Sequence, residues 1–450
     1  MNNFNAIDKL RGELNDRPWS AKTWLYWPGE LRKKGKMGKR NRVVITGMGI
    51  LAPNGTGLKQ FWRSLAAGES GIGPITLFDA TEFRTRVAGE VKEFDPLDYM
   101  PAEWKPKRMA RHTQLAFAAT QLALKNADFD PAARRRGAVL PVYIGVSTSA
   151  LDVIEKGFHE LEENGPRRVN SGVVSNCQPQ AAAHLIAEKL GVETQATTIS
   201  SACPSGIDAV AMAVERIRSG EAEVAIAGGA DAPVTPLTMA SFASAGLSSC
   251  ANADPRHASR PYDRASDSGV ISEGAGVVVL ESLEHAMARG ARTYLEITGY
   301  FSQMDHDPND PFVGLENAMR LSLANACRQP QEIDYICSYG PGHPILDAAE
   351  VKMIRRVFGA VADRVPVSSI KGVTGNPLSA SGPFQIIACA LAFQHQMIPP
   401  TANHENPLPG CDLDFVPGKA RKALLECALI NVRGLGGGNS SMVVERMRPD

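Results

Sequence analysis

Short, continuously apolar runs alternate along the chain with longer segments in which apolar residues recur with a helical period. The short runs are rich in β-branched residues, which favours strands that are buried on both faces. The longer segments, such as 113–127 and 314–326, have the pattern of amphipathic helices that cover a sheet. The alternation therefore predicts the α/β class. Strands are predicted at 42–46, 142–146, 223–227, 276–280, 295–297, 335–337 and 428–431.

The first 41 residues do not follow this pattern. Aromatic residues at 19–28 precede a strongly basic run at 32–40. A basic run without apolar periodicity is typical of a solvated, partly disordered segment, whereas the aromatic cluster would suit docking on the body or on a partner. We therefore expect residues 1–41 to form an N-terminal extension of one of these two kinds.

The first predicted strand runs into Gly-Met-Gly-Ile-Leu-Ala at 47–52, which has the glycine spacing of a dinucleotide-binding loop. Such a loop requires a helix to open at its glycines. The sequence Pro-Asn-Gly at 53–55 interrupts that helix at once, so we expect no nucleotide site here.

Charge and cysteine usage narrow the functional classes. Lys+Arg and Asp+Glu both number 48, so no net charge draws the whole protein to nucleic acid or to anionic lipid. The eight cysteines include no CxxC pair and no nearby histidine at metal-ligand spacing, which argues against disulfides and zinc. No apolar run is long enough to span a bilayer, and no signal-like segment follows Met1. We expect a cytoplasmic protein without metal, cofactor, membrane span or nucleic-acid partner.

Cys203 is the residue with the clearest chemical potential. It lies between an extended, β-branched stretch at 197–199 and an amphipathic run at 207–217, which predicts a thiol at the first turn of a helix. A helix N-terminus carries about half a positive charge and unpaired N–H groups, which favour thiolate over thiol. The alternative is an inert cysteine that packs as a small hydrophobe, and the local sequence does not decide between them.

From about residue 42 to 446 the motifs resemble, in order and spacing, β-ketoacyl synthases of the acyl-carrier-protein-dependent, chain-elongating type. The resemblance implies a thiolase fold, a five-layered αβαβα arrangement of two pseudo-equivalent halves at 42–290 and 291–450. It also implies a dimer, with Cys203 in the first half and its partners in the second. The matching segments are 42–49, 71–75, 94–99, 200–206, 260–263, 272–276, 371–375, 398–401 and 434–437.

Two histidines of the family are absent from this chain. The family's His-Gly-Thr motif begins here with Tyr339, and its Lys-x-x-Thr-Gly-His motif ends with Asn376. The histidines hold the enolate oxygen that develops when a malonyl thioester loses carbon dioxide, and losing one such donor costs about 3 kcal/mol. Both replacements can donate a hydrogen bond, but neither acts as an acid or base near neutral pH. We therefore expect ordinary condensation to be crippled.

Transfer of an acyl group to the cysteine requires fewer groups than condensation does, namely a thiolate and an oxyanion hole. The resemblance implies that the hole is built from the backbone N–H groups of Cys203 and Leu435, and that Lys371 and Glu350 form a buried pair that orders the pocket. Leu435 replaces a phenylalanine of the family and Arg433 replaces another aromatic residue, which predicts a wider or differently shaped entrance. The implied catalytic residues are Cys203, Lys371, Glu350, Asn376 and Tyr339.

Two histidines and a basic cluster are further candidates. His343, four residues after Tyr339, is a candidate substitute base, and His306 lies on a polar loop that the family places near the active-site mouth; a solvated loop histidine is the simpler interpretation of both.

Lys105, Lys107, Arg108 and Arg111 match the region where relatives receive the acidic carrier protein. A solvated helix face is the alternative.

These observations predict an acyltransferase of fatty-acid or polyketide biosynthesis. Cys203 takes an acyl group from acyl-carrier protein or acyl-CoA and passes it to an acceptor without decarboxylating malonate. One alternative is a genuine decarboxylating 3-oxoacyl synthase that uses a substitute for the missing histidines. Another is a non-catalytic, chain-length-type partner of an active synthase. We expect a homodimer, with a heterodimer as the alternative.

Overall fold

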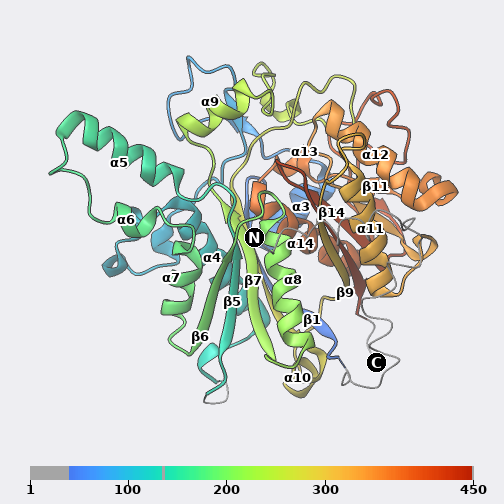
Figure 1. Cartoon of the computed structure of the whole chain (residues 1–450), viewed down its shortest axis with the longest axis horizontal. Coiled ribbons are helices and arrows are strands. Elements are labelled where there is room, and N and C mark those ends of the chain that lie inside the picture. The colour runs from blue at the N-terminus through green and yellow to red at the C-terminus, as the bar shows by residue number, and fades with distance from the viewer. Residues whose placement is uncertain (1–39, 134–136, 448–450) are drawn as a thin grey trace, which may run out of the picture. The chain divides into compact units, whose positions relative to one another are not determined.

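The computed structural model describes residues 40–133 and 137–447. The predicted extension at 1–41 lies outside the described residues except for its last two positions. The described chain is built on one sheet of eleven strands, in the order β11-β10-β14-β15-β9-β1-β8-β7-β5-β6 with β2 paired to β1 (Figure 1).

All seven predicted strands are present in this sheet, most of them longer than predicted, and β2, β6, β11 and β15 are strands that the sequence analysis did not predict. The strands of the sheet are β1 Val43–Ala52, β2 Gly55–Thr56, β5 Leu140–Gly145, β6 Thr194–Ile199, β7 Val224–Asp231, β8 Gly274–Ser282, β9 Leu295–Met304, β10 Tyr335–Cys337, β11 Val367–Ser368, β14 Cys427–Arg433 and β15 Gly438–Arg446. Two small sheets pair β3 Gly73–Pro74 with β4 Val87–Ala88, and β12 Met397–Ile398 with β13 Arg421–Lys422.

The helices include both segments that periodicity predicts, now bounded as α4 and α11. They are α3 Leu58–Ala67, α4 Arg111–Ala127, α5 Leu151–Asn164, α6 Val173–Asn176, α7 Ala181–Lys189, α8 Ser205–Arg218, α9 Pro236–Ser244, α10 Leu283–Ala288, α11 Val313–Ala326, α12 Pro344–Phe358, α13 Lys371–Thr374 and α14 Ser381–His395. Short 3₁₀ turns are η2 Pro96–Asp98, η3 Ala102–Trp104, η4 Pro106–Arg108, η5 Pro131–Ala133, η6 Pro255–His257, η7 Pro330–Glu332, η8 Gly359–Asp363 and η9 Leu378–Ala380.

The large sheet consists of two half-sheets with the same internal pattern. In each, two antiparallel neighbours are followed by two parallel ones: β1-β8-β7-β5-β6 in the first half and β9-β15-β14-β10-β11 in the second. The two half-sheets are joined where β1 pairs with β9, through Val44 with Glu296 and Ile45 with Leu295. This repeat confirms the two pseudo-equivalent halves.

Helices cover both half-sheets and fill the space between them. α4 and α7 pack on the outer face of the first half-sheet and α11 and α12 lie on the outer side of the second, with α8 and α14 between the two (Figure 1). α14 is buried without interruption over 381–393, as expected of a helix covered on all sides. The αβαβα layering predicted from the resemblance is therefore confirmed.

The glycine-rich run at 47–52 lies within β1, and no helix opens there. A Cβ atom at Gly49 would lie 2.0 Å from the backbone oxygen of Ala119, and one at Gly47 would lie 2.4 Å from that of Ala123. The glycines therefore allow β1 to approach α4 closely, which gives them a packing role.

The described residues form neither a membrane span nor a metal site. No helix in this part of the chain is long and apolar enough to cross a membrane. No cluster of His, Cys, Asp or Glu side chains within 40–133 and 137–447 has the geometry of a metal site. All eight cysteines are free thiols.

Gly49→Ala is expected to destabilise the fold by about 1–3 kcal/mol, because the new methyl group meets helix backbone that cannot move aside. The measurement is the shift of the urea unfolding midpoint, followed by circular dichroism. Gly73→Ala is the matched control, since its Cβ atom meets only the far end of the Lys92 side chain at 3.2 Å. Equal midpoints for the two variants would contradict the packing role of Gly49.

Candidate active site

Cys203 lies where the sequence places it, at the turn from β6 into α8. Ala202 adopts a φ of +61°, in the left-handed region, so the chain reverses sharply just before the nucleophile. Ser205 fixes the turn, because its hydroxyl accepts from Ser201 N at 2.8 Å and donates to Ala202 O at 2.5 Å. The thiol is therefore held at the start of α8 by hydrogen bonds within the turn.

A cavity of about 580 Å³ opens beside the thiol, between the two halves of the molecule. Cys203, Tyr339, Asn376, His343 and Leu435 all line it, so the structure brings these predicted residues together. Most of the remaining wall is apolar or small. It includes Ser147, Thr148, Ala202, Phe242, Leu247, Ser268, Gly269, Ile271, Pro341, Leu346, Leu378, Arg433, Gly434, Gly436 and Gly437.

The resting thiol is protonated at neutral pH, which differs from the thiolate that the helix position favours. Cys203 is only 6% exposed, and this burial raises its pKa to about 11. The charge of Lys371 and the N–H groups of Leu435 and Cys203 lower the pKa but do not overcome the burial. These amides are therefore close enough to the sulfur to act on a charge there, as an oxyanion hole requires.

Lys371 and Glu350 are both buried beneath the cavity, but no ion pair among the described residues joins them. Instead, both side chains hydrogen-bond to the backbone around Tyr339, Glu350 to N–H groups and Lys371 to a carbonyl oxygen. Glu350 accepts from the N–H of Tyr339 at 2.9 Å and of Gly340 at 2.8 Å, and Lys371 Nζ donates to Tyr339 O at 2.7 Å. The expectation of a direct Lys–Glu pair is corrected to a pair bridged by the Tyr339 backbone. Burial lowers the pKa of Lys371 to about 8.

Tyr339 and Asn376 occupy the cavity wall as neutral hydrogen-bonding groups. Burial raises the pKa of the Tyr339 phenol well above its ordinary value, so it stays protonated. The backbone of Asn376 pairs with Val270 O at 2.7 Å and Ser272 N at 3.0 Å, and its Oδ1 accepts from Ser381 at 3.2 Å. Within the described chain its Nδ2 has no such partner and is free to donate into the cavity.

The two candidate histidines differ in their surroundings. His343 is the residue that precedes α12, its side chain makes no capping hydrogen bond, and its Nδ1 is buried without a partner among the described residues. Burial lowers the pKa of His343, so the imidazole is neutral at pH 7. His306 is exposed, lies 3.2 Å from Gln303, and is not part of the cavity wall.

The basic cluster predicted to receive a carrier protein is smaller than expected. Arg111 forms an ion pair with buried Glu273 at 2.6 Å and donates to Val91 O. It is therefore a structural residue, and Lys105, Lys107 and Arg108 remain as candidates for binding a carrier protein. Lys107 and Arg108 are exposed.

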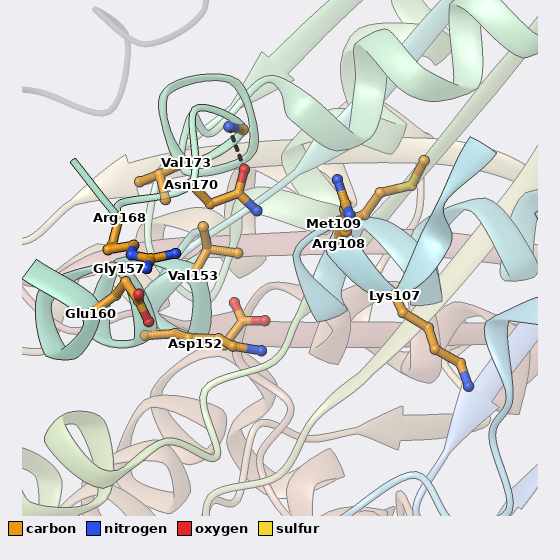
Figure 2. Close-up of a pocket in the computed structure, with 12 residues that line it drawn as sticks. Lys107, Arg108, Met109, Asp152, Val153, Gly157, Glu160, Arg168, Asn170 and Val173 are labelled. Atoms are coloured by element: carbon orange, nitrogen blue, oxygen red, sulfur yellow. Dashed lines mark hydrogen bonds between the residues drawn. The ribbon is translucent and has the colours of Figure 1, made fainter. Parts of the chain in front are cut away.

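A second pocket, of about 380 Å³, lies beside Lys107 and Arg108. Figure 2 shows these two on one wall and Asp152, Glu160 and Arg168 on the other. Its charge is therefore mixed rather than purely basic.

Asp231 is a site residue that sequence reasoning missed. It is fully buried at the end of β7, and its carboxylate accepts from the N–H groups of Ser147, Thr148 and Ser379. These bonds fix two segments of the cavity wall relative to each other. The available signal was an acidic residue at the end of an otherwise apolar strand.

Comparison with known protein families identifies the family of the chain. The model described as "Beta-ketoacyl synthase, N-terminal domain" matches residues 40–286, and "Beta-ketoacyl synthase, C-terminal domain" matches residues 294–405. The chain belongs to the β-ketoacyl synthase family. The family acts in fatty-acid and polyketide biosynthesis.

Curated relatives cover nearly the whole chain. A putative polyketide beta-ketoacyl synthase 1 of Streptomyces halstedii is 38% identical over 90% of this chain and 97% of its own length. A 3-oxoacyl-[acyl-carrier-protein] synthase 2 of Synechocystis sp. is 36% identical over 91% and 99%. Among solved structures, the ishigamide ketosynthase/chain length factor matches with a TM-score of 0.83 at 32% identity, over 91% of this chain and 100% of that one.

The reactivity of Cys203 toward iodoacetamide is expected to rise by about tenfold per pH unit from pH 7 to 9, because only the thiolate reacts and its pKa is about 11. The rate is measured on the Cys203 peptide by mass spectrometry, with exposed Cys327 as internal reference. Lys371→Met is expected to slow the reaction at pH 8, since it removes a charge that favours the thiolate. A rate that levels off by pH 8 would contradict the burial argument.

Proposed function

We propose that the protein takes an acyl group from acyl-carrier protein or acyl-CoA onto Cys203 and passes it to an acceptor, without decarboxylating a malonyl thioester. One observation carries the proposal. A buried nucleophile and the Leu435 amide share a cavity with Tyr339 and Asn376, which stand where the family has imidazoles.

The first half-reaction uses groups that the site retains. The sulfur of Cys203 attacks the thioester carbonyl, and the N–H groups of Cys203 and Leu435 hold the oxyanion of the tetrahedral intermediate. The carbon–sulfur bond to the donor then breaks, and the donor thiol leaves with the proton that the Cys203 thiol gives up. The positive charge of Lys371 favours the thiolate during the attack.

The second half-reaction takes its nucleophile from the acceptor. Formation of an enolate from malonate requires strong donors at the developing oxygen. The phenol of Tyr339 and the carboxamide of Asn376 are neutral donors, which suits them to orient an acceptor rather than to move its proton. They therefore support acyl transfer better than condensation.

A decarboxylating synthase is the second candidate function, and His343 is the observation that favours it. His343 lines the same cavity, with a neutral imidazole whose Nδ1 has no partner among the described residues. Such a group is able to donate one hydrogen bond to an enolate oxygen in place of a missing histidine.

The partners belong to the same proposal. A solved complex of a type II polyketide synthase acyl-carrier protein with its ketosynthase, 29% identical with a TM-score of 0.83 over 91% of this chain, supports a carrier protein as donor. Exposed Lys105, Lys107 and Arg108 are the basic residues that would attract its acidic surface. The ketosynthase/chain length factor neighbour supports a dimer, with an identical or a related subunit.

Incubation with a panel of acyl-carrier-protein and acyl-CoA thioesters is expected to add one acyl mass to the protein, measured by intact-mass spectrometry. Cys203→Ala is expected to abolish the addition because it removes the nucleophile. Cys327→Ala, which removes an exposed thiol that is not part of the cavity wall, is the matched control and is expected to keep the label. Labelling that persists in Cys203→Ala, or no labelling of the wild type by any donor, would overturn the proposal.

Release of carbon dioxide from malonyl-carrier protein separates the two candidate functions. The wild type is expected to release none above the Cys203→Ala background, whereas the double variant Tyr339→His/Asn376→His is expected to gain release because it supplies two imidazole donors. The assay follows radiolabelled carbon dioxide. Release by the wild type that His343→Ala abolishes would instead establish the decarboxylating synthase.

A further inference from the structure

The loop between β14 and β15 carries the Leu435 amide to the nucleophile, and three of its four residues at 434–437 are glycines. Gly436 and Gly437 adopt φ values of +86° and +89°, in the left-handed region that glycine occupies without strain. Two backbone hydrogen bonds close the turn, from Gly437 N to Gly434 O at 3.2 Å and from Gly434 N to Gly438 O at 2.8 Å. A segment so rich in glycine holds a single geometry only when surrounding contacts select it.

The loop must also sit close to the nucleophile. A Cβ atom at Gly434 would lie 2.7 Å from Pro204 Cδ, 3.0 Å from Ala202 Cβ and 3.3 Å from Cys203 N. The backbone of the loop therefore packs directly on the turn that carries the thiol. A small displacement of the loop changes the direction of the Leu435 N–H relative to the sulfur.

Arg433, the last residue of β14, supplies the contacts at the near end of the loop. Its Nη2 lies 2.6 Å from Asp305 Oδ2, and the two side chains are only 12% and 13% exposed. Its Nη1 donates to Asn439 Oδ1 at 2.7 Å, and its guanidinium carbon lies 4.5 Å from the ring centre of Phe312. A guanidinium held by a carboxylate, an amide and an aromatic face has little rotational freedom.

Asp305 supplies the contacts at the far end. Its backbone N–H donates to Gly437 O at 2.8 Å, and its Oδ1 accepts from Gly314 N at 3.0 Å, which fixes it to α11. Asn439 Nδ2 donates to the same Gly437 oxygen at 2.8 Å. The loop is thus held before its first glycine by Arg433 and at its last turn by Asp305.

We propose that Arg433 and Asp305 form a clasp that keeps the loop at 434–437 where the Leu435 amide faces the sulfur of Cys203. Arg433 is a positioning residue of the oxyanion hole and acts through the loop. The inference rests on the proposed function, because an oxyanion hole has a task only when an acyl thioester reacts at the sulfur. The entrance that Leu435 forms is accordingly held in one position by charge rather than by an aromatic side chain.

The test compares two reactions of the same sulfur. Acylation builds negative charge on a carbonyl oxygen and uses the amide pair, whereas alkylation by iodoacetamide displaces iodide and uses no oxyanion hole. Arg433→Met and Asp305→Asn are each expected to slow acylation at saturating donor by about tenfold to a hundredfold. Alkylation of Cys203 at the same pH is expected to slow by a smaller factor, because it loses only the part of the thiol pKa lowering that the Leu435 N–H supplies and builds no charge on a carbonyl oxygen.

Three further variants make the result specific. Arg433→Met/Asp305→Asn is expected to lose no more than either single variant, because each change alone already opens the clasp. Arg433→Lys keeps a charge and is expected to recover part of the acylation rate. Arg421→Met is the matched control, since it breaks a surface ion pair with Asp414 of the same 2.6 Å length and leaves both reactions unchanged.

The outcomes separate the clasp from the proposed function. Acylation of Arg433→Met at the wild-type rate, or equal slowing of acylation and alkylation, would overturn the clasp and leave the proposed function standing. A wild type that reacts with iodoacetamide but with no acyl thioester would overturn the proposed function and the clasp with it.

Discussion

The backbone of Ser379 is the contact on which the site depends, because it joins the two halves of the molecule beneath the cavity. Its carbonyl oxygen fits against two glycines of the first half, where Cβ atoms at Gly206 and Gly229 would come within 2.1 Å and 2.4 Å. Its N–H donates to the buried carboxylate of Asp231 at 2.9 Å. The start of α14 is thereby fixed against α8, and Asn376 comes to share a cavity with Cys203.

Burial sets the electrostatics of this junction. Desolvation raises the pKa of the Cys203 thiol and lowers the pKa of Lys371. Burial therefore favours the uncharged form of both groups, although the charge of each favours the charge of the other. The Tyr339 peptide unit stands between Lys371 and Glu350 and is hydrogen-bonded by both. The charged side chains of Lys371 and Glu350 therefore hold the backbone of Tyr339 in place. Replacement of the Tyr339 side chain leaves these backbone hydrogen bonds intact.

The sequence predicted what is local and missed what is long-range. The position of Cys203 before α8 and the helices over 113–127 and 314–326 follow from the local pattern, and the αβαβα layers follow from the resemblance to β-ketoacyl synthases; the structure confirms them. The Lys371–Glu350 contact and the surface role of Arg111 were wrong, because their partners lie elsewhere in the fold: the Tyr339 backbone for the first and Glu273 for the second. No spacing rule links such residues.

The proposed function divides the site into groups that the backbone supplies and groups that side chains supply. An oxyanion hole made of two N–H groups survives any side-chain replacement, provided that the loop carrying Leu435 stays in place. The glycines of that loop cannot hold it by themselves, and a leucine gives less packing area than an aromatic ring. The charge of Arg433, neutralised by Asp305 at the rim of the cavity, compensates for that loss, because a partly buried ion pair with several hydrogen bonds tolerates little displacement.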